Sequence, residues 1–167
     1  LGDCPDEAIC KACGTCKDYR YCPDEIELHP SSRYDVGATY DGRYLFSEAF
    51  IAHCKPLLSD ADFLHPLSGG GRRYFYFVPG RIVQFDAARR KTRFEGPCGT
   101  CGGYEYITGA TPVHLLKQEP LGPGFFRTDI AFGSHQGKFP LVLIGEEGAR
   151  LISQRKWRGL ELAPVTL

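Results

Sequence analysis

Cys10-Lys-Ala-Cys13-Gly14 and Cys98-Gly-Thr-Cys101-Gly102 are the two stretches that decide how this chain folds. Each is a CxxCG motif, and we call them the first and the second knuckle. Two intervening residues let both sulfurs of a motif reach one ion from a single tight turn, and two motifs supply four thiolates to one tetrahedral Zn²⁺. The glycine after the second cysteine can adopt a positive φ, which turns backbone N–H groups toward the sulfurs. The motifs therefore predict a structural zinc ion held by Cys10, Cys13, Cys98 and Cys101.

The knuckles lie far apart in the sequence, because 84 residues separate Cys13 from Cys98. Paired knuckles are usually about 15–20 residues apart. The entropic cost of closing a loop grows only logarithmically, so lengthening it from about 18 to about 84 residues adds roughly 1.4 kcal/mol. Structural zinc contributes on the order of 10–16 kcal/mol in small zinc-finger peptides. The insertion is therefore compatible with one shared site, whose ribbon halves we place at residues 4–22 and 81–108.

The chain has eight cysteines, so four lie outside this set. A disulfide framework is the alternative interpretation, but such scaffolds are usually short, whereas 167 residues can build a core of their own. A redox-active CxxC is expected at a helix N-terminus, and neither knuckle precedes a helical pattern. Cys4, Cys16 and Cys22, together with His29, form a candidate second metal site with unspecific spacing. Cys54 lies on the apolar face of an expected helix and is interpreted as a core residue.

The composition is that of an ordinary globular protein, with 43% hydrophobic and 24% charged residues. Twenty basic and twenty acidic residues give a formal net charge of zero, whereas a nucleic-acid-binding protein normally carries a basic excess. No apolar run approaches the roughly 20 residues of a membrane span. The first residues lack the basic start and apolar stretch of a secretion signal. We therefore expect a single domain over residues 1–167, located in the cytoplasm and without a membrane partner.

Strand patterns dominate the middle and the end of the chain. The expected consecutive antiparallel strands cover residues 73–78, 81–86, 91–95 and 104–108, with the second knuckle in the last turn. A weak alternation indicates a short strand over 24–29. A strand followed by a helix is expected over 44–54, with Ser47 as the N-cap. The segment 139–165 is expected to form a strand, a helix over 146–156 and a final strand. Together these elements predict an α+β fold, an antiparallel sheet with a few short helices and a zinc-ribbon-like site joining the two distant knuckles.

The sequence shows no Ser-His-Asp order, phosphate loop or HExxH motif, and a zinc ion held by four cysteines has no open coordination position. We therefore predict that the protein is not an enzyme. Basic residues gather over 72–93 around an aromatic strand, which is the best argument for nucleic-acid binding. Tyrosine is enriched at protein interfaces, although a sheet covered on both faces also explains these tyrosines. The weak candidates for partner binding are Arg72, Arg73, Tyr74, Tyr76 and His135.

The knuckles and the C-terminal third of the chain carry a resemblance to a known family. The two CxxCG motifs, their wide separation, Phe125-Phe-Arg127, Leu141-Val-Leu-Ile-Gly-Glu-Glu-Gly-Ala-Arg-Leu151 and Gly159-Leu-Glu-Leu-Ala-Pro-Val165 resemble the bacterial double-CxxCG motif family. Its members are regarded as immunity proteins encoded beside polymorphic toxins. The resemblance implies that the four knuckle cysteines are metal ligands and that a cognate toxin is neutralised by direct contact. The alternative is a zinc-ribbon nucleic-acid-binding module that uses the Arg-rich hairpin 72–93.

Overall fold

Three β-sheets and three short α-helices form the part of the chain that the computed structural model describes, residues 7–22, 33–39, 42–67, 73–116 and 119–167. The strands are β1 (Val36–Ala38), β2 (Tyr44–Ser47), β3 (Phe63–Leu67), β4 (Tyr74–Val78), β5 (Ile82–Val83), β6 (Arg93–Pro97), β7 (Tyr104–Thr108), β8 (Val113–His114), β9 (Phe125–Ser134), β10 (Phe139–Ile144) and β11 (Val165–Thr166). The helices are α1 (Glu48–Cys54), α2 (Ala87–Arg90) and α3 (Glu146–Ser153), with 3₁₀ turns η1 (Lys55–Leu57) and η2 (His135–Gly137). The predicted α+β class is confirmed. None of the described helices has the length and apolar character that a membrane crossing requires.

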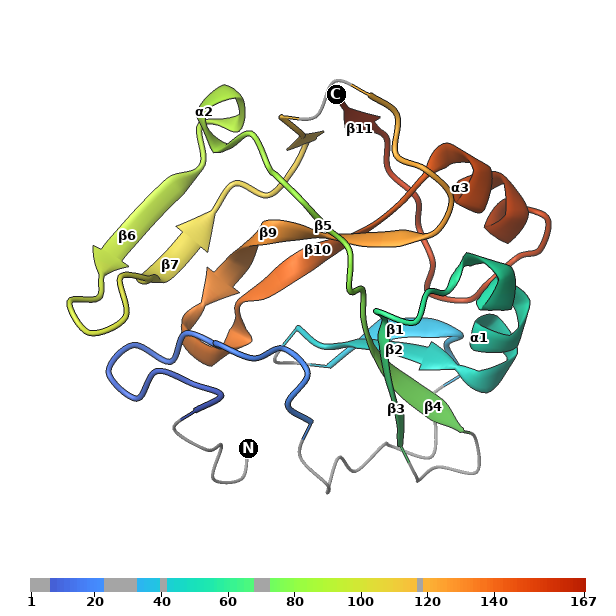
Figure 1. The fold of residues 1–167 in the computed structure, drawn as a ribbon, viewed down its shortest axis with the longest axis horizontal. Helices are drawn as coiled ribbons and strands as arrows, with labels where there is room; N and C mark the ends of the chain where they lie inside the picture. The colour runs from blue at the N-terminus through green and yellow to red at the C-terminus, as the bar shows by residue number, and fades with distance from the viewer. Residues whose placement is uncertain (1–6, 23–32, 40–41, 68–72, 117–118) are drawn as a thin grey trace.

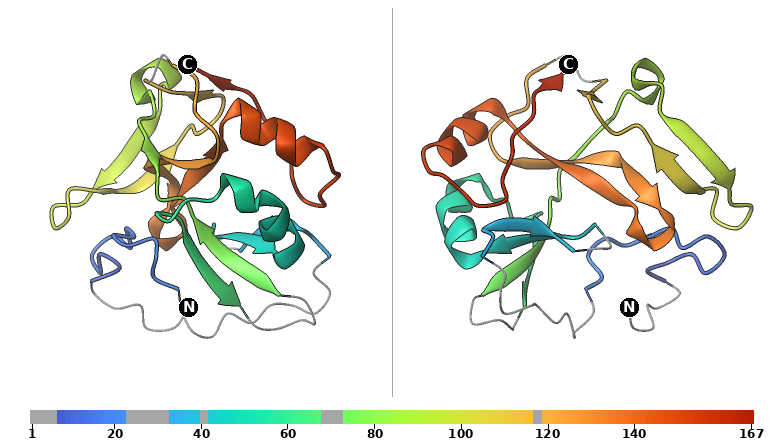
Figure 2. Two further views of the ribbon diagram at one scale, coloured as in Figure 1. Left: turned by 45° about the vertical axis from the view of Figure 1, so that its right-hand side comes forward. Right: turned by 180° about the vertical axis from the view of Figure 1, so that it is seen from behind.

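The strands form one antiparallel sheet in the order β1-β2-β4-β3 and a second in the order β10-β9-β7-β6. Strand β5 joins β9 in parallel, and β8 pairs in parallel with β11. The long β9–β10 hairpin crosses the centre of the molecule (Figure 1). Helices α1 and α3 lie at one end, while the β6–β7 hairpin and the first knuckle lie at the other, as the further views in Figure 2 also show. This arrangement keeps the knuckles away from the helical end.

An aromatic cluster joins the first sheet to β9 and α3. The rings of Phe46 and Phe77 have centroids 5.0 Å apart, and Phe77 meets Phe125 edge-on at 5.0 Å. Phe50 of α1 meets Trp157 edge-on at 5.1 Å. Edge-to-face pairs of this kind add stability beyond the burial of apolar area. The cluster therefore fixes the helical end of the molecule to the sheets.

Strand β4 is covered on both faces, as the covered-sheet interpretation of its tyrosines predicts. Phe77 faces the aromatic cluster, whereas Tyr74 and Tyr76 face a separate apolar cluster on the opposite side. The Tyr74 hydroxyl donates to the carbonyl of Tyr34 at 2.8 Å, and the Tyr76 hydroxyl donates to the carbonyl of Tyr19. The expectation that these two tyrosines contact a partner is corrected, because their side chains are only 4% and 0% exposed.

The hairpin expected between residues 73–78 and 81–86 does not form. Strand β4 pairs with β2 and β3, and only Ile82–Val83 of the second segment is a strand, parallel to β9. The intervening Pro-Gly turn is held elsewhere, because the N–H of Gly80 donates to Asp62 Oδ1 at 2.8 Å. A Cβ on Gly80 would lie 2.2 Å from the carbonyl oxygen of Ala61, so the turn packs closely on this loop. Both edges of β4 are already paired, so the second segment has no free edge of β4 to join. The Arg-rich segment 72–93 is therefore not a hairpin.

The C-terminal segment also differs from the prediction. Helix α3 ends at Ser153, and the final strand is only Val165–Thr166, paired with β8. The chain after α3 is held by Trp157, whose Nε1 donates to the carbonyl of Ile152 at 3.0 Å. It then passes β1 so closely that a Cβ on Gly159 would lie 2.1 Å from the carbonyl oxygen of Val36. The strand predicted over 24–29 lies outside the described residues.

Helix α1 begins at Ser47, as predicted. Its Oγ accepts the N–H of Phe50 at 3.2 Å and donates to Asp35 Oδ1 at 3.3 Å. We expect Ser47→Ala to lower the free energy of unfolding by about 1–2 kcal/mol, because the substitution leaves a buried N–H without its cap. Denaturant unfolding followed by circular dichroism measures this loss. Ser153→Ala, at the exposed end of α3, is the control, and equal stability of the two variants would contradict the capping role.

Candidate metal centre

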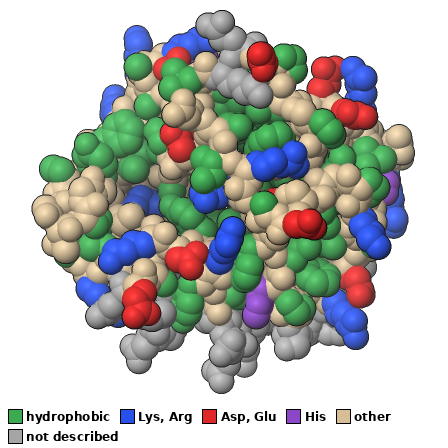
Figure 3. All heavy atoms as spheres, viewed as in Figure 1, with side chains coloured by type: hydrophobic (Ala, Val, Ile, Leu, Met, Phe, Trp, Pro, Cys, Tyr) green, Lys and Arg blue, Asp and Glu red, His purple; other side chains and the backbone are tan. Residues whose placement is uncertain are grey.

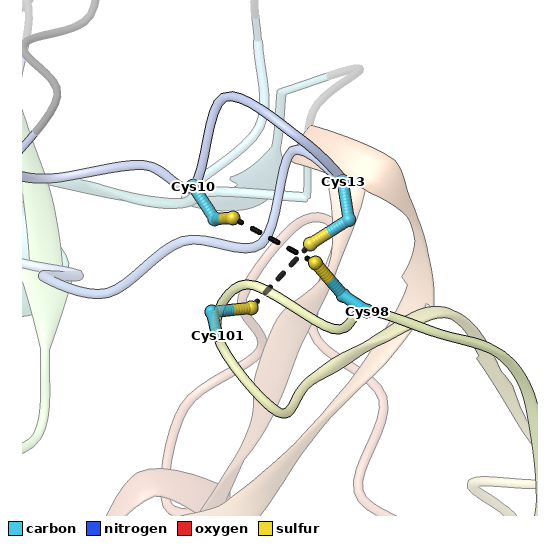
Figure 4. A group of neighbouring side chains, drawn as sticks. All are labelled: Cys10, Cys13, Cys98 and Cys101. Carbon is cyan, nitrogen blue, oxygen red and sulfur yellow. Dashed lines mark hydrogen bonds between the residues drawn. The ribbon is translucent and has the colours of Figure 1, made fainter.

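Four sulfur atoms from the two knuckles converge on one point (Figure 4). The Sγ atoms of Cys10, Cys13, Cys98 and Cys101 all lie within 4.8 Å of one another. The Cys13–Cys101 sulfurs are 3.6 Å apart, and the Cys10–Cys98 sulfurs are 4.0 Å apart. The prediction that the distant knuckles share one site is confirmed.

The spacing of the sulfurs suits a tetrahedral metal ion. A disulfide places its sulfurs about 2.05 Å apart, and Cys10, Cys13, Cys98 and Cys101 form no disulfide. A metal–sulfur distance of about 2.3 Å, typical of Zn²⁺, gives a tetrahedron with sulfur–sulfur edges of about 3.8 Å. The two distances of 3.6 and 4.0 Å lie on either side of that edge length. The four cysteines are therefore close enough to bind a metal ion without rearrangement of the chain.

The same backbone hydrogen bonds build both knuckles. The N–H of the glycine donates to the carbonyl of the first cysteine, at 2.7 Å in the first knuckle and 2.9 Å in the second. The N–H of the first cysteine donates to the carbonyl of the residue after the glycine, at 2.8 Å in both knuckles. Gly14 and Gly102 each have a φ of +71°, as the CxxCG spacing predicts. Two sequence-distant turns thus present their sulfurs in the same way.

Hydrogen bonds to the sulfurs favour the thiolate form at three of the four positions. The backbone N–H of Cys13 holds the pKa of Cys10 below its usual value, and the N–H of Cys101 does the same for Cys98. The hydroxyl of Thr15 lies 3.1 Å from Cys13 Sγ and lowers the pKa of Cys13. Thiolates are the form that binds metal, so these contacts prepare the site for an ion.

Cys101 is the exposed member of the group and the exception in its pKa. The N–H of Gly103 lies 3.4 Å from Cys101 Sγ and favours the thiolate. Desolvation and the neighbouring sulfurs of Cys13, Cys10 and Cys98 outweigh that bond and raise the pKa of Cys101 to about 11. In the metal-free protein, Cys101 therefore keeps its proton most firmly, and a bound cation would displace it.

The second knuckle is the turn of the β6–β7 hairpin, as predicted. Residues Pro97 and Tyr104 face each other in the two strands and close the hairpin around the turn. The first knuckle has its own short ladder, in which Ile9 pairs with Cys16. The two turns also touch directly, because the Thr15 hydroxyl donates to the carbonyl of Tyr104 at 3.4 Å. The β-structure thus holds both turns in place around the sulfurs.

Comparisons with known proteins place this site in no described group. The chain matches no family model, no curated protein and no solved structure. The chemistry of the metal centre therefore has to be inferred from its own geometry.

The turn between β9 and β10 forms a third wall of the site, which the sequence did not reveal. A Cβ on Gly14 would lie 3.1 Å from the backbone nitrogen of Gln136, so the turn packs closely on the first knuckle. Lys138 follows this turn and is only 1% exposed. Its Nζ donates to the carbonyl of Tyr104 and, at 3.2 Å, to that of Glu105. A lysine beside an apolar strand gives no sequence signal of burial, because lysines at strand ends are usually exposed.

The remaining cysteines have separate positions. Among the residues that the structure describes, the four knuckle cysteines are the single group close enough to hold a metal. Cys16 and Cys22 do not belong to it, and Cys22 packs against the apolar cluster that contains Tyr76. Cys4 and His29 lie outside the described residues, so the second metal site stays a prediction. Cys54 is buried in the core as predicted, and burial raises its pKa to about 12.

The predicted partner-binding residues lie in different places. His135 is exposed in η2, with its Nε2 3.0 Å from the Tyr106 hydroxyl. Arg73 is exposed and lies 3.5 Å from Glu48 Oε1, at the other end of the molecule. Arg72 lies outside the described residues. Of these candidates, His135 is the one that the structure places beside the metal centre.

Two arginines of segment 72–93 are held by different parts of the described structure. The guanidinium of Arg81 lies 4.4 Å from the centroid of Phe126 and donates to the carbonyl of Pro123 at 2.8 Å. Arg89 instead donates to the carbonyl of Leu167 at 3.2 Å. On the face shown in Figure 3, Lys and Arg side chains are interspersed with Asp and Glu side chains. This face therefore shows no continuous basic surface.

Proposed function

We propose that the four knuckle cysteines bind one structural Zn²⁺ and that the protein is an immunity-type binding protein, which neutralises a cognate toxin by direct contact. The observation that supports this proposal is the arrangement of the four sulfurs within 4.8 Å of one another. Four thiolates occupy every position of a tetrahedral zinc ion and leave none for water or substrate. In this proposal the zinc ion stabilises the fold. The toxin-neutralising activity is inferred from the resemblance to the double-CxxCG immunity family.

The surface beside the metal centre supports a role in protein binding. Phe94 and Tyr106 of the β6–β7 hairpin are 38% and 39% exposed. Tyr106 also contacts the exposed His135, with ring centroids 4.9 Å apart. Exposed aromatic residues on a rigid element are frequent at the centres of protein interfaces. Phe94 pairs with Ile107 and Tyr106 pairs with Glu95, so the two rings lie on opposite faces of the hairpin. We place the contact with the toxin on the face that carries Tyr106 and His135.

The experiment is a binding measurement with the product of the neighbouring gene. We expect a tight one-to-one complex, detected by isothermal titration calorimetry and by light scattering after gel filtration. Tyr106→Ala combined with His135→Ala should weaken the complex at least tenfold, roughly the effect of losing an interface hot spot. Ile82→Ala removes a more exposed apolar side chain, 54% exposed, from another strand and should leave the affinity unchanged. Absence of any complex would contradict the immunity function.

The nucleic-acid-binding module is the alternative proposal. Its support is weaker, because segment 72–93 is not a hairpin and its arginines have protein partners. Binding to DNA or RNA that weakens steeply with salt would favour this alternative. No binding at low salt would remove it.

A further inference from the structure

A buried ammonium group lies beside the metal centre. Lys138 stands at the junction of η2 and β10, and its Nζ donates to the carbonyls of Tyr104 and Glu105. These two residues begin β7, directly after the second knuckle. The next residue, Phe139, packs in the apolar cluster with Tyr76. The ammonium is therefore fixed between the knuckle hairpin and the apolar cluster.

The charge of Lys138 has no carboxylate partner in the described structure, since neither of the ion pairs there involves it. A buried ammonium without a counter-charge costs several kcal/mol, and burial accordingly lowers the pKa of Lys138. Negative charge on Cys13 and Cys101 acts in the opposite direction and raises it. The geometry agrees, because the Tyr104 carbonyl that accepts from Nζ also accepts from the Thr15 hydroxyl, which lies 3.1 Å from Cys13 Sγ.

The charge of the filled centre follows from its composition. Four thiolates around one dication carry a net charge of −2. A buried positive charge nearby stabilises such a centre, because interactions in the interior are little screened by water or salt.

We propose that Lys138 is the counter-charge of the metal centre, so that filling the centre holds the β9–β10 turn closed over the knuckles. This inference rests on the proposed zinc binding. Loss of the metal frees the two knuckles from each other, and Lys138, which contacts carbonyls directly after the second knuckle, then becomes accessible to solvent. The residue acts through its charge and its place in the turn, and it is not a metal ligand.

The first test compares the zinc affinities of variants by competition with a chromogenic chelator. Lys138→Met removes the charge and keeps an unbranched side chain, and we expect zinc to bind about 10–100-fold more weakly, as for other residues behind metal ligands. Lys138→Arg should recover part of the affinity. The control Lys156→Met changes an exposed lysine after α3 and should stay within twofold of the wild type. An unchanged four-sulfur absorption spectrum of the Co²⁺-loaded Lys138→Met protein would show that no ligand has been lost.

The second test uses the wild-type chain, so it does not depend on the folding of a variant. An amine-reactive acetylating reagent should leave Lys138 unmodified in the zinc-loaded protein and modify it after chelation, while Lys156 reacts in both states. Peptide mass spectrometry reads the two sites separately. Equal protection of Lys138 with and without zinc, or a Lys138→Met affinity within twofold of the wild type, overturns the inference and leaves the zinc site standing. A wild-type protein that binds no zinc overturns both.

Discussion

Cys13→Ser is expected to abolish zinc binding and to release the first knuckle from the β6–β7 hairpin. Cys13 is buried, and its sulfur lies 3.6 Å from that of Cys101 on the other knuckle. A metal shared by the knuckles closes a loop of 88 residues in the chain, counted from Cys10 to Cys98. The entropy of closing a loop of this length corresponds to about 4–5 kcal/mol, so we expect the free energy of unfolding to fall by about that amount.

Elemental analysis and hydrogen exchange measure these effects. The zinc content should fall from one per chain to nearly zero, and amide exchange should accelerate over residues 7–22 before the remainder of the molecule opens. Chelation of the wild-type protein should reproduce the same exchange pattern. The matched control is Cys54→Ala, which removes a buried cysteine outside the centre and should retain one zinc ion. A Cys13→Ser protein that still binds zinc at full occupancy would contradict the site.

Phe77→Ala should cause a loss of stability of similar size at the other end of the molecule. Phe77 is fully buried, and its ring meets Phe46 and Phe125 at centroid distances of 5.0 Å. Removing a buried phenylalanine ring costs about 3–5 kcal/mol, because it loses apolar burial and leaves a cavity. In a chain of this length, such a loss lowers the melting temperature by roughly 6–20 °C.

Thermal and denaturant unfolding measure this change, and the zinc content provides an independent readout. Phe77 lies outside the metal centre, so the folded variant should still carry one zinc ion per chain. Phe94→Ala, on the exposed β6–β7 hairpin, should cost less than about 1 kcal/mol. Similar losses for the two variants would contradict the assignment of the aromatic cluster as the main core.

Local patterns in the sequence predicted local structure well. The CxxCG spacing predicted the positive φ of Gly14 and Gly102, and Ser47 predicted the start of α1. Both predictions succeed because each feature depends on contacts within a few residues. The interpretation of β4 as a strand covered on both faces also depends on local geometry, since neighbouring side chains of a strand point to opposite faces.

Features that depend on distant partners were not predictable. Strand β5 pairs with β9, far away in the sequence, while both edges of β4 are occupied by β2 and β3, and no local pattern indicates these partners. The burial of Lys138 depends on carbonyls more than 30 residues earlier in the chain. Contacts between residues so far apart in the sequence form only when the intervening chain has folded. The sequence therefore identified the metal ligands but not the wall that encloses them.

The distance between the knuckles has a consequence during synthesis of the protein. The ribosome makes the first knuckle 84 residues before it reaches Cys98. At roughly 5–20 residues per second, the nascent chain carries Cys10 and Cys13 for about 4–17 seconds before their partners exist. During that interval the two thiols of the first knuckle lack the other two cysteines and are accessible to oxidants and to other metal ions. A metal ion can therefore be held by all four cysteines only after Cys101 has been made.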